Sequence, residues 1–254
     1  NLAGQVGDGS NTNRSEPVTV VGLANVKKIV ADGRASCALL VDGTVKCWGA
    51  NGFAQLGDGT QTDRNTPVSM IGVSNAIDIE AGGGHNCVLL ADTTVKCVGW
   101  NSHGQLGDGT QETRSTAVTV SGLSNVTKLS AGGWHTCAIL ADKSLKCWGR
   151  NQGGQLGDGT TTLRLLPTNA NISNVVAMST GGAHSCALKS DETVFCWGDN
   201  ANGQLGDGTH NFHTNPAIVS NLNGVQAVSA DGNQSCALLN DDTLKCWGKN
   251  EFGQ

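Results

Sequence analysis

The cysteines are the residues most suited to chemistry in this 254-residue chain, because all ten occur in pairs ten positions apart. The pairs are Cys37/Cys47, Cys87/Cys97, Cys137/Cys147, Cys186/Cys196 and Cys236/Cys246. Val41-Asp42-Gly43 suits a three-residue hairpin loop, which would place the thiols of the first pair opposite each other on one face. Their Cβ separation is then close to that of a disulfide. We therefore predict five disulfides, one in each hairpin, each contributing about 2.5 to 3 kcal/mol in the chain-entropy model.

Two other roles for the cysteines stay open at this stage: buried free thiols, and a metal or redox site. Zinc ligands usually come in close pairs such as Cys-x2-Cys, and redox catalysis needs Cys-x-x-Cys or one distinctive thiol. Neither grouping occurs here, so the structural disulfide is favoured. Disulfides imply an oxidising compartment, and we expect an extracellular, cell-surface or periplasmic location.

Histidine and arginine recur with the same spacing of about 50 residues as the cysteine pairs. His85, His135 and His184 share one position, which Ala35 and Gln234 fill in the other two copies. Three histidines could ligate a metal, but one repeat separates equivalent atoms widely. We predict a structural hydrogen bond from each, with no metal and no cofactor.

The recurring arginines follow an aspartate of a Gly-Asp-Gly loop by six residues. They are Arg14, Arg64, Arg114 and Arg164, with His213 in the fifth place. We predict that they brace the loops; a functional ring of positive charge on one face is the alternative. Each loop has a single carboxylate and no lysine, so a calcium or phosphate site is not favoured.

No catalytic constellation stands out from the repeated background, and we predict that the chain is not an enzyme. The clearest departures from the repeat lie in loops, where recognition residues concentrate. We predict a binding role for Trp100, His103, Leu163, Leu165, His210, Phe212 and His213, with ordinary drift of the repeat as the alternative.

The composition excludes several classes of protein. With 38% hydrophobic and 15% charged residues, a net charge of -5 and no long apolar run, the chain fits neither a disordered nor a membrane-inserted protein. No basic run is present, which argues against nucleic acid as a partner. The first residue is Asn1 rather than Met, which indicates a processed chain or a fragment.

Internal repeats must position all of these residues. A Gly-Gln-Leu-Gly-Asp-Gly-Thr motif places its glutamine at positions 5, 55, 105, 155, 204 and 254. We predict one repeat domain over residues 1–254, with repeat phases 5–54, 55–104, 105–154, 155–203 and 204–253.

Short apolar stretches separated by Gly, Asn, Asp and Thr predict strands rather than helices. In the second repeat we expect strands at 67–71, 76–80, 85–90 and 94–98, followed by an ordered loop at 101–116 between blades. Four strands per unit suit a blade of a β-propeller, so we predict an all-β propeller of blades of about 50 residues.

The motif Gly-x-Asn-x-x-Gly-Gln-Leu-Gly-Asp-Gly-Thr, followed by Arg, Pro, Val and Ala-Gly-Gly-x-His-x-Cys-Ala-Leu, resembles the regulator of chromosome condensation repeat over the whole chain. The resemblance implies a β-propeller, typically with seven blades, whereas five repeats are present. A piece of a larger ring, a segment of a longer array and a closed ring of five all stay open. The disulfides point to a secreted member of bacterial type.

The tryptophan after the second cysteine, at 48, 148, 197 and 247, is expected to wedge between blades. Residues 133–136 also resemble a motif of a plant ultraviolet photoreceptor of this family. That motif is one residue short and no Arg follows, so light sensing is not favoured.

The favoured function is a non-enzymatic binding or structural module that recognises a protein or glycan through loops on one propeller face. One alternative is a repeat unit that self-associates into a surface appendage or fibre. The other, implied by the founding member of the family, is guanine-nucleotide exchange on a small GTPase. That activity would need a long inserted loop, which repeat spacings of 49 to 50 residues leave no room for.

Overall fold

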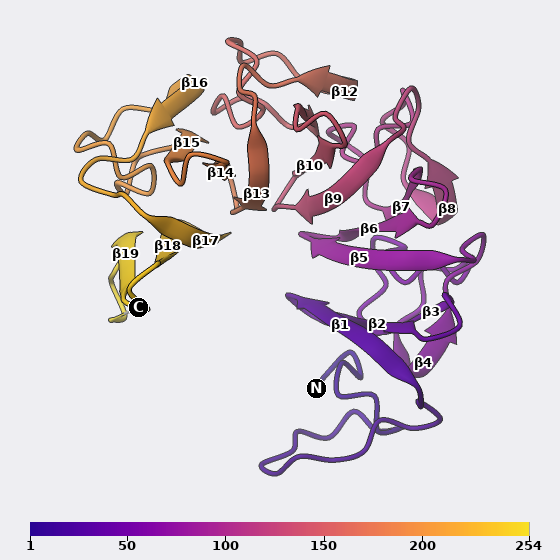
Figure 1. Ribbon diagram of the computed structural model, residues 1–254. Helices are drawn as coiled ribbons and strands as arrows, with labels where there is room; N and C mark the ends of the chain where they lie inside the picture. Colours follow the sequence, from indigo (N-terminus) through magenta and orange to yellow (C-terminus); the bar gives the residue numbers. More distant parts are fainter. Residues whose placement is uncertain (254) are drawn as a thin grey trace.

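The computed structural model describes residues 1–253 and contains strands, turns and loops, with no helix in that range. It therefore has no helix long and apolar enough to cross a membrane. The strands form five antiparallel sheets placed side by side around an axis, as Figure 1 shows. The predicted all-β propeller of repeated blades is confirmed.

Each sheet repeats the same order of strands from the axis outward. The innermost strands are β1 (Val26–Asp32), β5 (Ala76–Gly82), β9 (Val126–Ala131), β13 (Val175–Thr180) and β17 (Val225–Asp231). The second strands are β2 (Ala35–Leu40), β6 (His85–Leu90), β10 (His135–Leu140), β14 (His184–Lys189) and β18 (Gln234–Leu239). The third strands are β3 (Val45–Gly49), β7 (Val95–Gly99), β11 (Leu145–Gly149), β15 (Val194–Gly198) and β19 (Leu244–Gly248). The outer strands are β4 (Arg64–Ser69), β8 (Arg114–Thr119), β12 (Arg164–Asn169) and β16 (His213–Ile218).

The strands of the second repeat lie within a few residues of their predicted positions. The strand expected at 67–71 is β4, however, and it pairs with β3 of the preceding sheet. Each sheet therefore takes its outer strand from the start of the next repeat. The long loop before that strand joins the third and outer strands of one sheet, and it reaches across to the next blade on the way. The fifth sheet has three strands within the described residues, whereas the other four have four.

The cysteine hairpins have the predicted register. In the first hairpin, Cys37 pairs with Cys47 and Leu39 with Val45, and Gly43 has the left-handed φ of 78° that the three-residue loop requires. The second and fourth hairpins likewise place Cys87 opposite Cys97 and Cys186 opposite Cys196.

All five disulfides are present with Cα–Cα distances of 4.0 to 4.1 Å, and no described cysteine is free. The bridges are Cys37–Cys47, Cys87–Cys97, Cys137–Cys147, Cys186–Cys196 and Cys236–Cys246. Each bridge crosses two neighbouring strands of one blade, so it stiffens a hairpin without joining two blades.

The hydrophobic core lies between consecutive sheets. Between the first two sheets, Leu39 and Val45 pack with Ile79 and Val88. Leu56, from the long loop after β3, belongs to the same cluster. The loop thus fills the space between two blades, as predicted, and its burial contributes to the blade contact.

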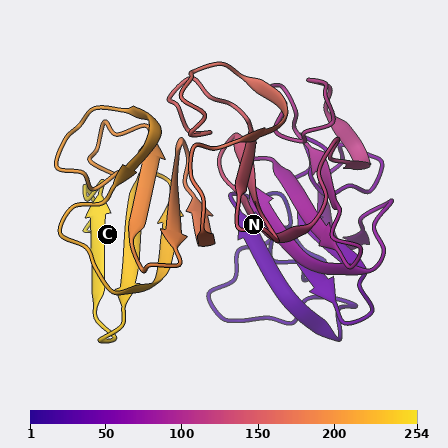
Figure 2. The same ribbon diagram turned by 45° about the horizontal axis from the view of Figure 1, so that its top comes forward.

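The five blades form an open arc rather than a closed ring, as Figures 1 and 2 show from two directions. Ile29 on β1 is 72% exposed, whereas Ile79 at the same repeat position is 0% exposed. At the other end, Leu244 on β19 is 65% exposed and its equivalent Leu145 is 1% exposed. The difference arises because no blade covers these two end faces in the structure, so a closed ring of five is not what the chain forms here.

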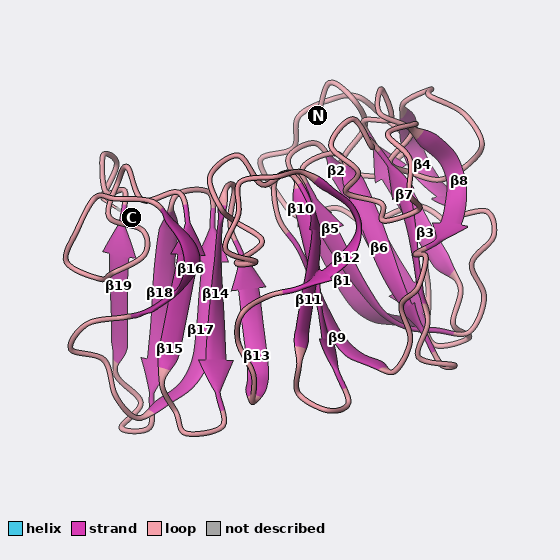
Figure 3. Ribbon diagram, turned by 90° about the horizontal axis from the view of Figure 1, so that it is seen from above, coloured by secondary structure: helices cyan, strands magenta, loops and turns pink. Residues whose placement is uncertain are grey.

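Residues 14–19 correspond in the repeat to the outer strand β4 but form no strand. An outer strand requires a third strand beside it, and none lies beside this segment. The strands of the complete sheets end in loops at both faces of the arc, which Figure 3 shows edge-on. We call the face that carries the long interblade loops and the turns between first and second strands the loop face.

Candidate binding surface

The long loops are held by a repeated set of side chains. In the third loop, Asp108 Oδ1 accepts hydrogen bonds from Thr110 and from Asn101 Nδ2, while Oδ2 accepts one from Arg114 Nε at 2.8 Å. His213 replaces the arginine in the fifth loop and lies 2.7 Å from Asp207. These arginines are paired with loop aspartates, so they brace the loops and do not form a free ring of charge.

The carboxylates of these loops are stabilised in their ionised form. Burial alone would raise the pKa of Asp207, but hydrogen bonds from Thr209, His213 and Asn200 outweigh it and lower the pKa to about 2. The loops consequently keep their shape at neutral and mildly acidic pH.

The cysteines take no part in the surface of the inner blades. Cys97 and Cys196 are fully buried, as are Cys87 and Cys186, their disulfide partners. A buried disulfide has no thiol to offer to a metal or a substrate. The cysteines predicted as disulfide residues therefore have a structural role, and they lie apart from any binding site on the loop face.

The repeated tryptophans join the loops to the blades. Trp148 is fully buried, and its indole N–H donates to the carbonyl oxygen of Gln105 at 2.9 Å. Because Gln105 lies in the loop that leaves the preceding blade, this bond connects two blades. Trp48, Trp197 and Trp247 make the same contact with Gln5, Gln155 and Gln204. In the second blade Val98 takes the core position, and Asn86 donates to the carbonyl of Gln55 instead.

The repeated histidines form hydrogen bonds between blades. His135 Nε2 lies 2.8 Å from Ser185 Oγ of the next blade, and that hydroxyl donates to the carbonyl of Gln155. Since the hydroxyl proton is directed to the carbonyl, Nε2 must be the donor to Oγ, which fixes the neutral tautomer. His85 and His184 make equivalent contacts with Thr136 and Ser235. Burial lowers the pKa of His135 to about 3.

The histidine also explains a paired change that the sequence alone did not reveal. A Cβ added at Gly132 would lie 2.6 Å from Cε1 of His135, so this position requires glycine wherever histidine is present. Where aspartate replaces the glycine, at Asp32 and Asp231, the histidine is replaced by Ala35 and Gln234. The departures in the end blades therefore follow from packing.

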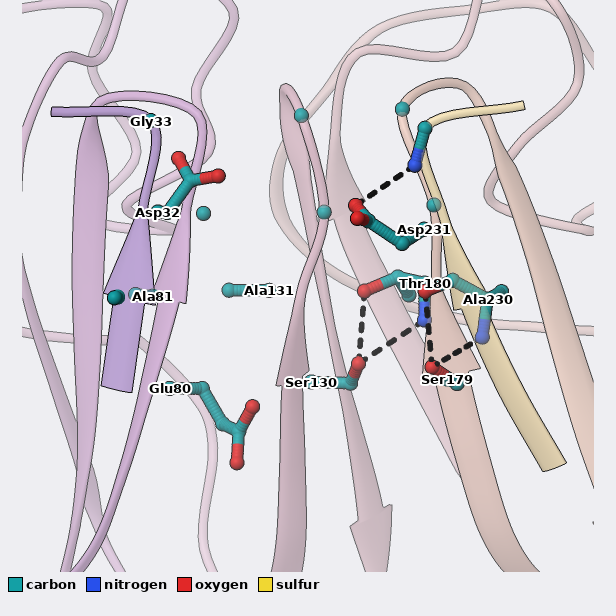
Figure 4. Close-up of a pocket in the computed structure, with 17 residues that line it drawn as sticks. Asp32, Gly33, Glu80, Ala81, Ser130, Ala131, Ser179, Thr180, Ala230 and Asp231 are labelled. Atoms are coloured by element: carbon teal, nitrogen blue, oxygen red, sulfur yellow. Dashed lines mark hydrogen bonds between the residues drawn. The ribbon is translucent and has the colours of Figure 1, made fainter. Parts of the chain in front are cut away.

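A cavity of about 480 Å³ lies along the axis, lined by the ends of the innermost strands. Figure 4 shows Asp32 and Asp231 on opposite sides of it, with Ser130, Ser179 and Thr180 engaged in hydrogen bonds between neighbouring blades. Burial and the charge of Asp231 raise the pKa of Asp32. No group of three or more potential metal ligands occurs among the described residues, and the cavity presents no nucleophile paired with a base.

The loop face is where the five blades differ most. Two positions lie side by side there, because the backbone N–H of residue 150 donates to the carbonyl of residue 134, and each other blade repeats this bond. The turn position holds Arg34, Gly84, Trp134, Ala183 and Asn233. The position after the third strand holds Ala50, Trp100, Arg150, Asp199 and Lys249. The third residue of the loop adds Phe53, His103, Gly153 and Asn202.

Five of these residues, from the loops and turns of the first three blades, form a patch that we call the aromatic row: Phe53, Trp100, His103, Trp134 and Arg150. Phe53 stacks on Trp100 with ring centroids 5.0 Å apart, and His103 meets Trp100 edge-on at 5.6 Å. The guanidinium of Arg150 lies 4.7 Å above the ring of Trp134. Phe53 is 47% exposed, and the other four residues are half-buried.

The aromatic row uses the aromatic residues that the blades do not need. Four of the six tryptophans fill the repeated core position, and the remaining two, Trp100 and Trp134, are both in the row. Mutual contacts hold these rings in place before any partner arrives. A pre-ordered aromatic surface loses little side-chain entropy on binding, which suits recognition.

The structure brings together only some of the residues predicted for binding. Trp100 and His103 are in the row, and Leu165 packs against Gly104, the next residue to His103. Leu163 and Phe212 lie at the outer ends of later loops, where Phe212 is 55% exposed. His210 is exposed with Nδ1 3.3 Å from the carbonyl oxygen of Ala201, and the contact of His213 with Asp207 gives that residue a bracing role.

Phe53, Trp134 and Arg150 were not predicted as binding residues. A signal for them existed, because aligning the repeats shows that their positions vary most from blade to blade. That these positions are neighbours in space follows from the backbone bond between residues 134 and 150 and from the loop crossing to the next blade. Neither is visible in a single repeat.

Comparison with known proteins supports the fold. A family model described as an RCC1-like domain matches residues 1–254. Human WBSCR16 is similar in structure, with a TM-score of 0.79 and 23% identity over 90% of this chain and 63% of that one. Yeast RCC1 (Prp20) bound to Kap60 has a TM-score of 0.76 and 20% identity over 89% of this chain and 56% of that one. The chain thus spans less than two thirds of either protein.

A plant protein extends the comparison to receptors. The ectodomain of the Arabidopsis thaliana receptor kinase ACR4 has a TM-score of 0.56 and 19% identity, covering 92% of this chain and 70% of that chain. At these identities the likeness shows the fold alone. None of the curated protein sequences compared with the chain matches it.

Proposed function

The chain belongs to the RCC1-like domain family, and on that premise we propose that residues 1–254 act as one non-enzymatic binding module. The module recognises a protein or glycan through the aromatic row on its loop face. The observation that carries this proposal is the gathering of Phe53, Trp100, His103, Trp134 and Arg150, none of which belongs to the hydrophobic core clusters between the blades. Trp and Arg are the residue types that most often dominate binding energy at protein interfaces.

Proteins of similar fold support a binding role. Prp20 has been solved bound to Kap60 and binds Gsp1p and histones, and the ACR4 structure is a receptor ectodomain. We propose that this chain likewise binds a macromolecule, and that it does so outside the cytoplasm. The five disulfides support an oxidising compartment.

The test compares the row with two apolar residues of later loops, Leu163 and Phe212. Immobilised wild-type chain, a Phe53→Asn/Trp100→Ala variant and a Leu163→Thr/Phe212→Thr control are incubated with secreted and cell-surface proteins and with an array of glycans. We expect the row variant to lose the bound molecules and the control to retain them. Equal retention by the row variant, or loss in the control alone, would overturn the proposal.

Self-association is a second candidate, which the exposed apolar end faces favour. Ile29 and Leu244 are well exposed at positions that are buried in the inner blades. Light scattering during size exclusion tests this function: assemblies that grow with concentration and dissolve on Ile29→Asp substitution would support it. Purely monomeric behaviour at high concentration would exclude it. Acceleration of nucleotide release from small GTPases would instead favour an exchange factor.

A further inference from the structure

Arg150 differs from the arginines that brace the loops. Arg14, Arg64, Arg114 and Arg164 each form an ion pair with a loop aspartate at 2.5 to 2.8 Å. Among the described residues, no carboxylate lies within ion-pair distance of Arg150. Its charge is therefore not neutralised within the chain, although the protein as a whole is acidic, with a net charge of -5.

The guanidinium of Arg150 is nevertheless held in one orientation. It lies over the ring of Trp134, and its Nε and Nη2 atoms both donate to Gln152 Oε1, at 3.2 and 3.0 Å. These contacts occupy one edge of the guanidinium plane. The adjacent edge, formed by Nη1 and the second N–H of Nη2, makes no hydrogen bond within the described residues. Two parallel N–H groups on such an edge match a carboxylate.

The rest of the aromatic row carries no charge at neutral pH. Phe53, Trp100 and Trp134 are apolar or neutral, and burial together with the charge of Arg150 lowers the pKa of His103. The row therefore presents one oriented cation beside aromatic surface, with no carboxylate of its own. Charge complementarity points to a ligand with an anionic group next to an apolar one.

We propose that the aromatic row binds an acidic side chain of a protein partner, with the carboxylate on Arg150 and a neighbouring apolar side chain against Phe53 and Trp100. The proposal rests on the proposed binding function and names the chemistry of its partner. A protein is favoured over an acidic sugar because Phe53 and Arg150 already cover one face of each indole. With one face of each indole covered, little flat aromatic surface is left for a sugar ring to stack on.

The test uses a displayed library of random linear peptides selected on the intact chain, followed by affinity measurements on the selected peptides. Arg150→Gln is compared with Arg34→Gln, which removes the same charge from the same face in the first blade. We expect enriched peptides to carry Asp or Glu beside a Pro, Leu or aromatic residue. Loss of a charge-assisted hydrogen bond should weaken their binding roughly tenfold or more in Arg150→Gln and in Arg150→Lys, with little change in Arg34→Gln.

Each outcome decides a separate point. Peptides that need Trp100 but bind Arg150→Gln as tightly as the wild type would overturn this proposal and leave the binding function intact. Retention of acidic glycans without any Trp100-dependent peptide would overturn the choice of a protein partner. Failure to enrich any ligand that depends on Trp100 would contradict both proposals. Arg150→Lys keeps the charge but not the planar guanidinium with its two parallel N–H groups. It therefore replaces Arg150→Gln in the affinity measurements if that variant is unstable.

Discussion

Trp148 and Trp100 are the same type of residue in neighbouring blades, yet they belong to two different regions. Trp148 is fully buried, recurs in three other blades and ties a loop to its blade through Gln105. Trp100 stands two residues beyond Val98, which fills the core position in its own blade, and stacks on Phe53 at the surface. Residues that recur from repeat to repeat therefore join the blades, whereas residues that depart from the repeat are available for recognition.

The largest loss of stability is expected from removing one of the repeated, buried tryptophans. Trp148→Ala should lower the free energy of unfolding by about 3–5 kcal/mol, because it removes a buried indole and leaves the cavity unfilled. Trp100→Ala should lower it by less than about 1 kcal/mol, since most of this contact is at the surface. Urea unfolding followed by circular dichroism measures both. Similar losses of unfolding free energy in the two variants would show that Trp100 contributes to the stability of the blades as much as Trp148 does.

Removal of a disulfide should have the next largest effect on the free energy of unfolding. Replacing Cys137 and Cys147 together by alanine should cost about 2–4 kcal/mol of unfolding free energy, because the hairpin loop is no longer closed in the unfolded chain. The five bridges should also differ in reactivity under native conditions. Cys246 is exposed at the open end of the arc, whereas both cysteines of the Cys87–Cys97 and Cys186–Cys196 bridges are buried.

The order in which the five bridges are reduced can be measured with a mild reductant, followed by alkylation and mass spectrometry. We expect the Cys236–Cys246 bridge to be alkylated first. Alkylation of the inner bridges at the same rate would mean that the blades open as readily as the end face.

The buried histidines predict a loss of stability in acid. Burial lowers the pKa of His135 from 6.5 to about 3 in the folded protein. As the pH falls below 6.5, His135 is protonated in the unfolded chain but stays neutral in the folded chain. The free energy of unfolding therefore declines from about pH 6.5 down to the pKa of His135 in the folded protein, about 3. For one histidine the loss is about 2 kcal/mol at pH 5.

His135→Gln serves as the matched variant, because Gln234 occupies the same position in the fifth blade. Its unfolding free energy should depend less steeply on pH between 7 and 5, by roughly the contribution of one histidine. An unchanged slope in thermal or urea unfolding would show that His135 does not remain neutral in the folded state.

The smallest effect is expected from the loop braces. The Arg164 side chain is 35% exposed, and surface ion pairs of this kind contribute up to about 1 kcal/mol. Arg164→His copies the natural His213 and should change the unfolding free energy by less than about 0.5 kcal/mol. Collapse of the fold in Arg164→His would show that the loops depend on this charge far more than their contacts indicate.

Much of this molecule could be read from the sequence because the repeat reports the same geometry five times. The cysteine spacing predicted the hairpin register and the pairing of Cys37 with Cys47. The recurrence of Arg164 and of His135 predicted bracing and hydrogen bonding, since a residue needed once per blade serves the blade.

The features that could not be predicted depend on contacts between blades, which the sequence of a single repeat does not show. The sequence alone did not show that β4 joins the preceding sheet or that the arc stays open between β1 and β19. The aromatic row was only partly foreseen for the same reason, because Phe53 reaches Trp100 of the second blade from a loop of the first blade. The position of Trp134 beside Arg150 becomes visible only when strand ends are paired.

The role of the aromatic row is tested most sharply by replacing the whole row with residues that other repeats carry at the same positions. The variant combines Phe53→Asn, Trp100→Ala, His103→Gly, Trp134→Ala and Arg150→Asp. Its melting temperature and its retention of the wild-type ligands are measured side by side. We expect a melting temperature within a few degrees of the wild type and loss of all ligands that the wild type retains. Retained binding would show that the aromatic row is not the recognition surface. An unfolded chain would show that the row is needed for folding.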